Sequence, residues 1–130
     1  MYSQSTKSIM VSVVPEYEDD RSAPSEGYYV WSYRVNIANK SEQTVRLLNR
    51  HWIIVDEAGQ VQEVRGTGVV GVQPLLKPGE EFEYSSTTHL NSSSGLMMGS
   101  YEMRTEDQDV IEVKIPAFSL DCPHTRKNVN

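Results

Sequence analysis

Apolar and polar residues alternate along most of this chain, which is the pattern of β-strands with one buried face. The clearest run covers residues 28–38, in which every second side chain from Tyr29 to Ile37 is aromatic or aliphatic. Ser32 and Arg34 lie between them on the opposite face. Apolar stripes with the helical period are lacking, so we expect strands to dominate.

Similar alternating or apolar runs follow at residues 44–48, 51–56, 61–65, 81–87, 99–105 and 109–115. Short strands separated by short turns predict an all-β fold, a two-sheet antiparallel β-sandwich with seven or eight strands. The inward faces supply the expected core: Trp31, Tyr33, Val35, Trp52, Ile54, Tyr84, Tyr101, Ile111 and Val113.

The 130 residues fit one domain, which we place at residues 8–121. Residues 1–7 and 122–130 are rich in polar side chains and predict a flexible N-terminus and a flexible C-terminal tail. Residues 17–27 predict a mobile acidic loop between the first two strands.

Charge excludes two classes of partner. The formal net charge is −6, and the basic residues are scattered, so neither nucleic acid nor an anionic membrane surface is expected to bind. The chain has no run of 18 apolar residues, and its N-terminus lacks the basic and apolar regions of a signal peptide. The only cysteine, Cys122, cannot form an internal disulfide, so we expect a cytoplasmic protein.

Gly66, Gly68 and Gly71 form a G-x-G-x-x-G pattern, which in dinucleotide-binding proteins opens a helix. Pro74 and Pro78 exclude a helix here. Two interpretations remain. The glycines can form a structural loop between strands, or their backbone N–H groups can bind an anion such as pyrophosphate, with Arg65 or Arg50 as the countercharge.

Candidates for catalysis are few. Cys122 lies two residues before His124, but in a predicted tail that would not hold the two side chains in place. His51 is expected to be a hydrogen-bonded packing residue of a strand, and His89 to be a solvated side chain in a polar loop. We therefore expect no catalytic centre and no enzyme activity.

The residue types that commonly bind metals do not follow the spacing of a known metal site either. The three histidines are far apart in the sequence, and the acidic groups at residues 16–20 and 106–109 lack the spacing of a calcium loop. Both acidic groups are interpreted as solvated loop charges, and we expect no bound metal or cofactor.

Several segments recur in the same order in one known family, and together they cover about residues 8–121. They are residues 39–41 (Asn-Lys-Ser), 50–54 (Arg-His-Trp-Ile-Ile), 66–74 (Gly-Thr-Gly-Val-Val-Gly-Val-Gln-Pro), 76–79 (Leu-Lys-Pro-Gly), 84–86 (Tyr-Ser-Ser), 95–103 (Gly-Leu-Met-Met-Gly-Ser-Tyr-Glu-Met) and 115–120 (Ile-Pro-Ala-Phe-Ser-Leu). The chain thereby resembles the ApaG domain family, in its stand-alone bacterial form.

This resemblance implies an immunoglobulin-like or fibronectin type III-like sandwich that acts as a recognition module. Bacterial members are associated by name with cobalt resistance and magnesium efflux. One departure concerns the tyrosine that often pins a corner of fibronectin modules, because Phe82 occupies that spacing here and Tyr84 follows two residues later.

Three functions from different classes follow. The first is a non-catalytic binding module for a protein partner, because sandwich domains carry function on loops and edges. The alternative is nucleotide or pyrophosphate binding through Gly66, Gly68, Gly71 and Arg65. The third is an enzyme or a dedicated metal binder. The oligomeric state is left open by the sequence.

Overall fold

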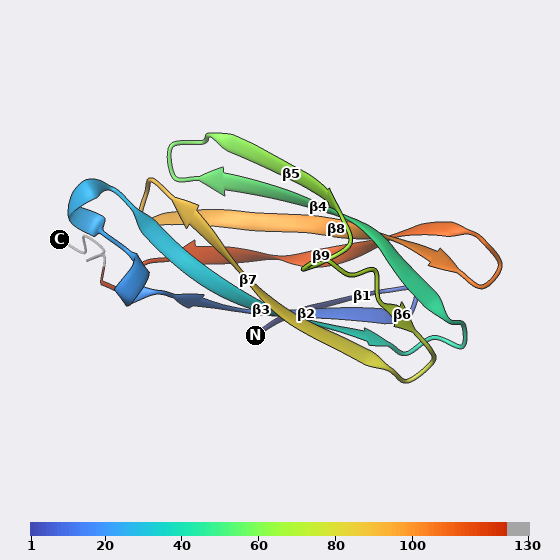
Figure 1. The fold of residues 1–130 in the computed structure, drawn as a ribbon. Helices are drawn as coiled ribbons and strands as arrows, with labels where there is room; N and C mark the ends of the chain where they lie inside the picture. Colours follow the sequence, from blue (N-terminus) through green and yellow to red (C-terminus); the bar gives the residue numbers. More distant parts are fainter. Residues whose placement is uncertain (125–130) are drawn as a thin grey trace.

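The computed structural model describes residues 1–124 and consists of two packed antiparallel sheets (Figure 1). The predicted β-sandwich is therefore confirmed, and residues 1–124 form nine strands rather than the expected seven or eight. The strands are β1 (Tyr2–Thr6), β2 (Ile9–Tyr17), β3 (Tyr29–Asn39), β4 (Val45–Asp56), β5 (Val61–Thr67), β6 (Leu75–Leu76), β7 (Glu81–Leu90), β8 (Ser94–Thr105) and β9 (Val110–Asp121).

One sheet has the order β1-β2-β3-β7. The other has the order β5-β4-β8-β9, and the short β6 pairs with β4 beyond the end of β5. On one side β9 packs against β1 and β2 and closes the sandwich. On the other side β7 and β5 end their sheets, and this open side carries the features described below.

The alternation of apolar and polar residues along the strands explains which side chains form the core. The inward residues of β2, β3, β8 and β9 are buried, and Trp31, Tyr101 and Phe118 are the largest side chains that are almost fully covered. All the predicted core residues are buried except Ile111, which packs partly covered against the rest. Burial raises the pKa of Tyr84 and of Tyr101, whose hydroxyl groups hydrogen-bond to each other across the two sheets.

The N-terminal residues differ from the expectation of a flexible end. The segment Tyr2–Thr6 pairs with β2 as an edge strand, and the Tyr2 hydroxyl lies 3.1 Å from the Ser119 hydroxyl. Its outer face is polar because it is exposed, which explains why composition alone did not identify a strand.

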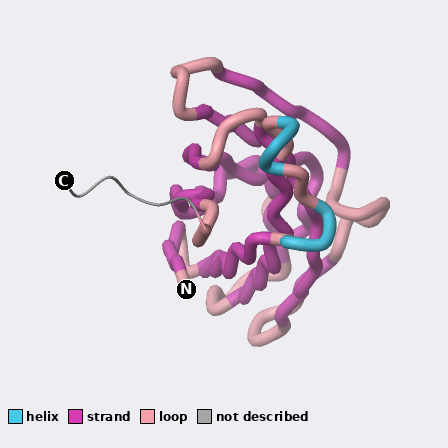
Figure 2. Tube along the Cα trace, turned by 90° about the vertical axis from the view of Figure 1, so that its left-hand side faces the viewer, coloured by secondary structure: helices cyan, strands magenta, loops and turns pink. Residues whose placement is uncertain are grey.

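Between β2 and β3 the acidic segment forms two short 3-10 turns, η1 (Asp19–Arg21) and η2 (Pro24–Glu26), which lie at the end of the molecule shown in Figure 2. The described residues contain no helix long and apolar enough to cross a membrane.

Asn39 is fully buried at the end of β3. Its side-chain N–H groups donate to the carbonyls of Gln43 (2.8 Å) and Leu76 (2.9 Å), and its side-chain oxygen accepts from the N–H of Ser41 (3.0 Å). One amide therefore fixes both the turn after β3 and the position of β6 in the opposite sheet.

Candidate functional site

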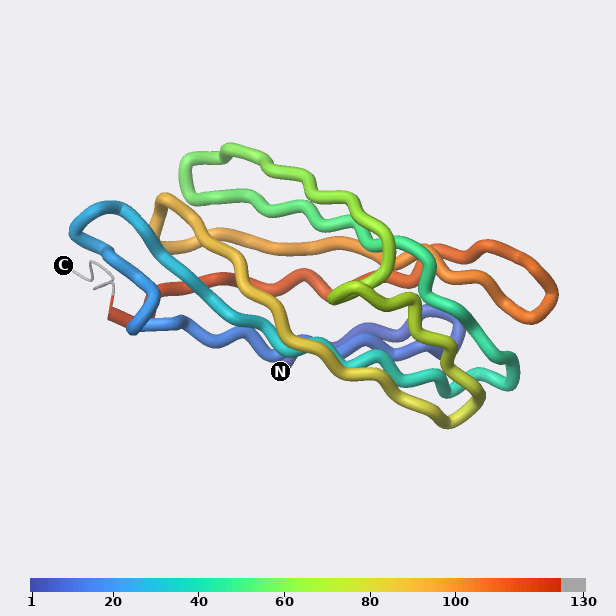
Figure 3. Tube along the Cα trace, in the orientation of Figure 1, coloured from blue at the N-terminus to red at the C-terminus, as the bar shows by residue number. Residues whose placement is uncertain are grey.

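The predicted glycine motif lies where the edge of the second sheet is interrupted. Gly66 belongs to β5, and the chain then leaves the sheet edge for residues 68–74, here called the edge loop, before β6 resumes pairing (Figure 3). At the tip, the N–H and C=O groups of Val69 and Val72 exchange two hydrogen bonds of 2.8 and 2.9 Å. The two residues between them, Val70 and Gly71, have φ of 41° and 83°, the pattern of a type I′ turn.

Each motif glycine has its own structural reason. A Cβ at Gly66 would lie 2.6 Å from the guanidinium carbon of Arg50, and one at Gly68 would lie 2.2 Å from the carbonyl oxygen of Val72. Gly68 also has a φ of +65°. Gly71 has open space around it and needs only its left-handed backbone. The loop interpretation of the sequence thus has a physical basis at all three positions.

The base of the edge loop is tied to β4 at several points. Arg50 donates to the carbonyls of Thr67 (3.1 Å) and Gly68 (2.9 Å), and the Gln73 side chain donates to the carbonyl of Leu48 (3.0 Å). The carbonyl of Leu48 also accepts from the N–H of Gly68 at 2.8 Å. A bulge in β4 between Leu47 and Asn49 presents these groups, so the loop is held by the framework.

Apolar side chains are exposed on and beside this loop. Val70 is 58% exposed at the turn, and Val72 and Leu75 are 44% and 47% exposed. Val69, in contrast, is buried and anchors the tip to the core. A fixed loop therefore presents aliphatic surface to the outside.

The predicted anion-binding residues are only partly brought together. Arg65 forms an ion pair with Glu63 at 3.5 Å and lies opposite His51 in the β4–β5 pairing, while Gly66 lies opposite Arg50. The N–H groups of Gly68, Val69 and Val72 donate to backbone carbonyls. Fewer amide donors are thus available to an anion than the sequence suggested, and pyrophosphate binding stays a prediction.

Arg65 and Gly66 instead share the rim of a hollow of about 580 Å³ on the outer face of the second sheet. His51 lies here, half-buried, with its ring nitrogen 2.7 Å from a Glu63 oxygen. Glu112 also lines this hollow, and Lys114, 3.0 Å from it, lowers the pKa of that carboxyl. The hollow therefore has paired charges of both signs rather than a single anion-binding field.

A second hollow lies on the inner side of the same edge, between β5 and β7. Its volume is about 260 Å³, and Arg50 lines it together with Tyr33, Trp52 and Ser86. Burial raises the pKa of Tyr33, while a hydrogen bond from Ser86 and the charge of Arg50 act in the opposite direction. Arg50 was the second countercharge considered from the sequence, and it is the one that contacts the loop.

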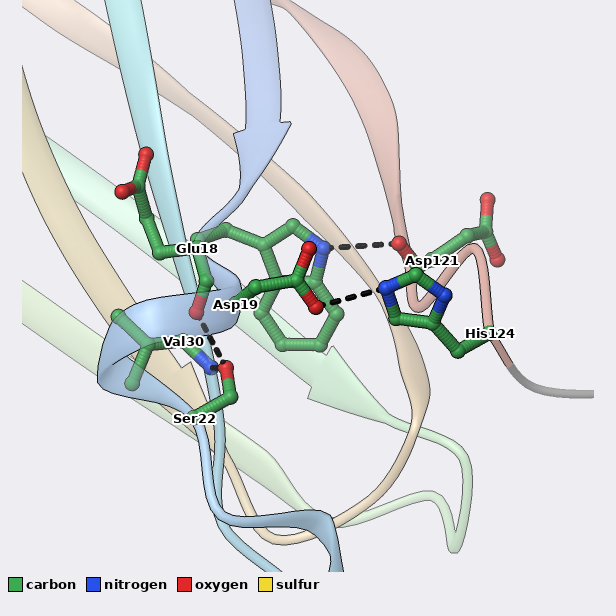
Figure 4. Close-up of polar contacts among 7 residues, drawn as sticks. Glu18, Asp19, Ser22, Val30, Asp121 and His124 are labelled. Atoms are coloured by element: carbon green, nitrogen blue, oxygen red, sulfur yellow. Dashed lines mark hydrogen bonds and ion pairs between the residues drawn. The ribbon is translucent and has the colours of Figure 1, made fainter.

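The tail residues expected to be flexible are held where the structure describes them. Cys122 is buried, and its N–H donates to the carbonyl of Ser93 at 2.9 Å. The His124 ring lies 2.6 Å from an Asp19 oxygen (Figure 4). The indole N–H of Trp31 donates to the carbonyl of Asp121 at 3.0 Å. Residues 122–124 thus have contacts that the sequence did not lead us to expect, while residues 125–130 of the predicted tail lie outside the described residues.

No group of three histidine, cysteine, aspartate or glutamate side chains that could hold a metal ion is found within residues 1–124. The feature that sequence reasoning missed is Val70, because the turn preference of a Val-Gly pair gives no sign of a left-handed valine. The glycine that follows was the only available signal.

Comparison with known proteins gives consistent results. The family model of the ApaG domain matches residues 19–105. Proteins named Protein ApaG from Paramagnetospirillum magneticum and Parvibaculum lavamentivorans are 54% and 56% identical over 130 and 127 residues, which is 100% and 98% of both chains. The crystal structure of a putative ApaA protein from Bordetella pertussis superposes with a TM-score of 0.86 at 44% identity, covering 95% of this chain and 98% of that one. The chain belongs to the ApaG domain family.

Proposed function

We propose that the protein is a non-catalytic binding module that recognises a protein partner through the tip of the edge loop. The observation that carries this proposal is Val70, an exposed β-branched residue held at a φ of 41°. Such a conformation costs on the order of 1–3 kcal/mol for a residue other than glycine. Burial does not offset this cost, because more than half of the side chain is exposed.

Asparagine followed by glycine is the pair that a type I′ turn favours. A valine at this position therefore lowers stability while presenting an aliphatic side chain to the outside. Backbone strain of this kind is concentrated at sites of contact and recognition. We infer that the side chain is retained for a contact with another molecule.

The supports of the loop favour the same role. Arg50 and Gln73 tie its base to β4, and the buried Val69 anchors its tip. A surface that is already ordered loses little conformational freedom when a partner binds. With Val72 and Leu75 it offers a small apolar contact area suited to a protein surface.

On this proposal, the link of the family name with cobalt resistance and magnesium efflux is indirect and acts through the partner. We expect the module to act in the cytoplasm and to need neither a cofactor nor a catalytic residue.

The test is the substitution Val70→Asn. It should raise the free energy of unfolding by about 1 kcal/mol, because asparagine tolerates the left-handed backbone that valine resists. The same substitution should reduce binding of the native partner. Immobilised wild-type and variant proteins would be exposed to cell extract, and retained proteins quantified by mass spectrometry.

Val110→Asn is the matched control, since Val110 is also an exposed valine (54%) but begins β9 and does not belong to the edge loop. A partner retained by the wild type and the control but lost with Val70→Asn supports the proposal. Equal retention by all three proteins would show that the loop tip is not the contact surface.

A further inference from the structure

The second half of β7 lies at the edge of its sheet without the features that normally protect an exposed edge. Natural edges carry charges, prolines or bulges that prevent another strand from pairing. The second half of β7, residues 85–90, reads Ser-Ser-Thr-Thr-His-Leu, with no acidic, lysine, arginine or proline residue. Its pairing with β3 shows no shift of register along its length. This half of β7 is a regular strand with one open side.

The hydrogen bonds identify which groups of β7 are open. The N–H of Asn39 donates to the carbonyl of Glu80, whereas Val30 bonds away from β7, accepting from Glu18 and donating to the Ser22 hydroxyl. Backbone groups alternate in direction along a strand. Residues of β3 with odd numbers therefore bond to even-numbered residues of β7. The backbone groups of Ser85, Thr87 and His89 consequently face the open side.

The hollow between β7 and β5 lies beside these groups. Trp52 and Ile54 line its apolar part, and Gln62 and Val64 of β5 line the part across from β7. A further hollow of about 140 Å³ shares Ile54, Gln62 and His89 with it, so the groove continues along the edge. A strand next to β7 would place every second side chain over this groove.

One end of the groove carries unbalanced positive charge. None of the ion pairs found within residues 1–124 includes Arg50. One of its terminal nitrogens donates to the carbonyls of Thr67 and Gly68. The hydroxyl groups of Tyr33 and Ser86 lie in the same hollow. Guanidinium and hydroxyl donors together suit a carboxylate.

We propose that an extended peptide segment of a partner protein adds to the open side of β7 as a further strand and places an acidic side chain on Arg50. This rests on the proposed function as a protein-binding module, but it uses a different surface from the edge loop. Main-chain hydrogen bonds from Ser85, Thr87 and His89 hold the peptide, and its inward side chains lie over Trp52 and Val64. Charge complementarity with Arg50 selects an acidic peptide.

The probe is a capped heptapeptide, acetyl-Thr-Val-Thr-Glu-Thr-Val-Thr-amide, in which valine, glutamate and valine share one face. The matched control has glutamine in place of glutamate. NMR titration of the labelled protein should shift the amides of β7 and β5. Amide exchange should slow at Ser85, Thr87 and His89, whereas Ser86 and Thr88 are already bonded to β3. The glutamate peptide should bind about tenfold more tightly, the lower limit for a hydrogen bond to a charged group.

Two pairs of variants separate the contribution of the main-chain hydrogen bonds from that of the Arg50 charge. Thr87→Pro removes an outward N–H and should weaken peptide binding by about two- to tenfold, as expected for loss of a main-chain hydrogen bond. Thr87→Val keeps that N–H and should bind normally. Arg50→Gln should bind both peptides equally, while Arg50→Lys should keep a preference for glutamate.

The proposal is overturned by shifts outside the β7–β5 groove or by exchange that slows without alternation. It is equally overturned if N-acetylglutamate amide binds as tightly as the peptide, since the strand would then contribute nothing. If Thr87→Pro does not fold, the wild-type exchange pattern and the Arg50 pair decide alone. Val70→Asn should leave peptide binding unchanged, so failure of the edge-loop proposal and failure of this one are distinguishable.

Discussion

Gly66→Ala tests the physical account of the glycine motif, because the structure assigns its cost to one neighbouring side chain. The added Cβ would lie 2.6 Å from the guanidinium carbon of Arg50, a distance that no real contact tolerates. The far end of Arg50 must therefore move. It would lose hydrogen bonds of 3.1 and 2.9 Å to the carbonyls of Thr67 and Gly68.

A hydrogen bond to a charged group contributes about 1.5–3 kcal/mol net when its partners are buried. Arg50 is half-buried, so water can replace part of the lost hydrogen bonding. We therefore expect Gly66→Ala to reduce the free energy of unfolding by about 1–3 kcal/mol. An Arg50→Ala background removes the three atoms that lie nearest to the added Cβ, all of which belong to the guanidinium group. Alanine is then favoured over glycine in a strand, by about 0.5–1 kcal/mol, so the sign of the effect should reverse.

The assay is equilibrium unfolding in urea of the four proteins of the double-mutant cycle, with the coupling energy as the result. Gly68→Ala and Gly71→Ala serve as reference variants for a large and a small loss of stability. We expect about 3 kcal/mol or more for Gly68→Ala, which combines a positive φ with a Cβ placed 2.2 Å from a backbone oxygen, and about 1 kcal/mol for Gly71→Ala, which has open space. An equal cost of Gly66→Ala in both backgrounds would refute the explanation through Arg50.

Three further predictions concern the core, the pH dependence and the anion hypothesis. Trp52→Ala should cost about 3–5 kcal/mol in the free energy of unfolding, because Trp52 is buried, and a loss below about 1 kcal/mol would contradict its packing role. Burial raises the pKa of Tyr101 above its ordinary value of 10.0, so its protonated phenol stabilises the fold fully below pH 10 and this contribution is lost as the pH rises above 10. The free energy of unfolding should fall there by up to about 1.4 kcal/mol per pH unit for each such tyrosine, and Tyr101→Phe should make the slope shallower by one such increment; an unchanged slope in alkaline urea titrations would contradict this. Pyrophosphate titrated to about millimolar concentration should shift the amides of residues 65–72 if the glycine motif binds anions, with an affinity that falls as salt screens exposed charge, and absence of any shift would exclude that alternative.

The sandwich and most of its core were predictable because alternation fixes which face of each strand is buried. Tyr33, Trp52 and Tyr101 fall on inward faces for this reason alone. Two elements gave no such signal. The outward side chains of β1 are exposed, and β6 has only two residues, so neither contains enough apolar periodicity to detect.

The site was less predictable for two physical reasons. Arg50 and Gly66 are neighbours only across the β4–β5 pairing, so the sequence could not show that the glycine makes room for the arginine. Val70 has a left-handed backbone, which valine normally avoids. Sequence reasoning assigns valine its usual extended conformation, so it could not predict this one. The burial of Cys122 was hidden for a different reason, since the residues that follow it are mostly polar and their composition predicts an exposed tail.

The buried amide of Asn39 determines how the edge loop can open. It fixes β6 at one end of the loop from a strand of the opposite sheet, and Arg50 fixes the other end. Releasing the loop therefore requires disruption of contacts that join both sheets, and not merely fraying of a surface turn. The protected amides of Gly68 and Val69 should accordingly exchange with solvent only in openings that approach global unfolding. The loop that presents the contact surface would then belong to the most cooperative part of the domain, not to its mobile periphery.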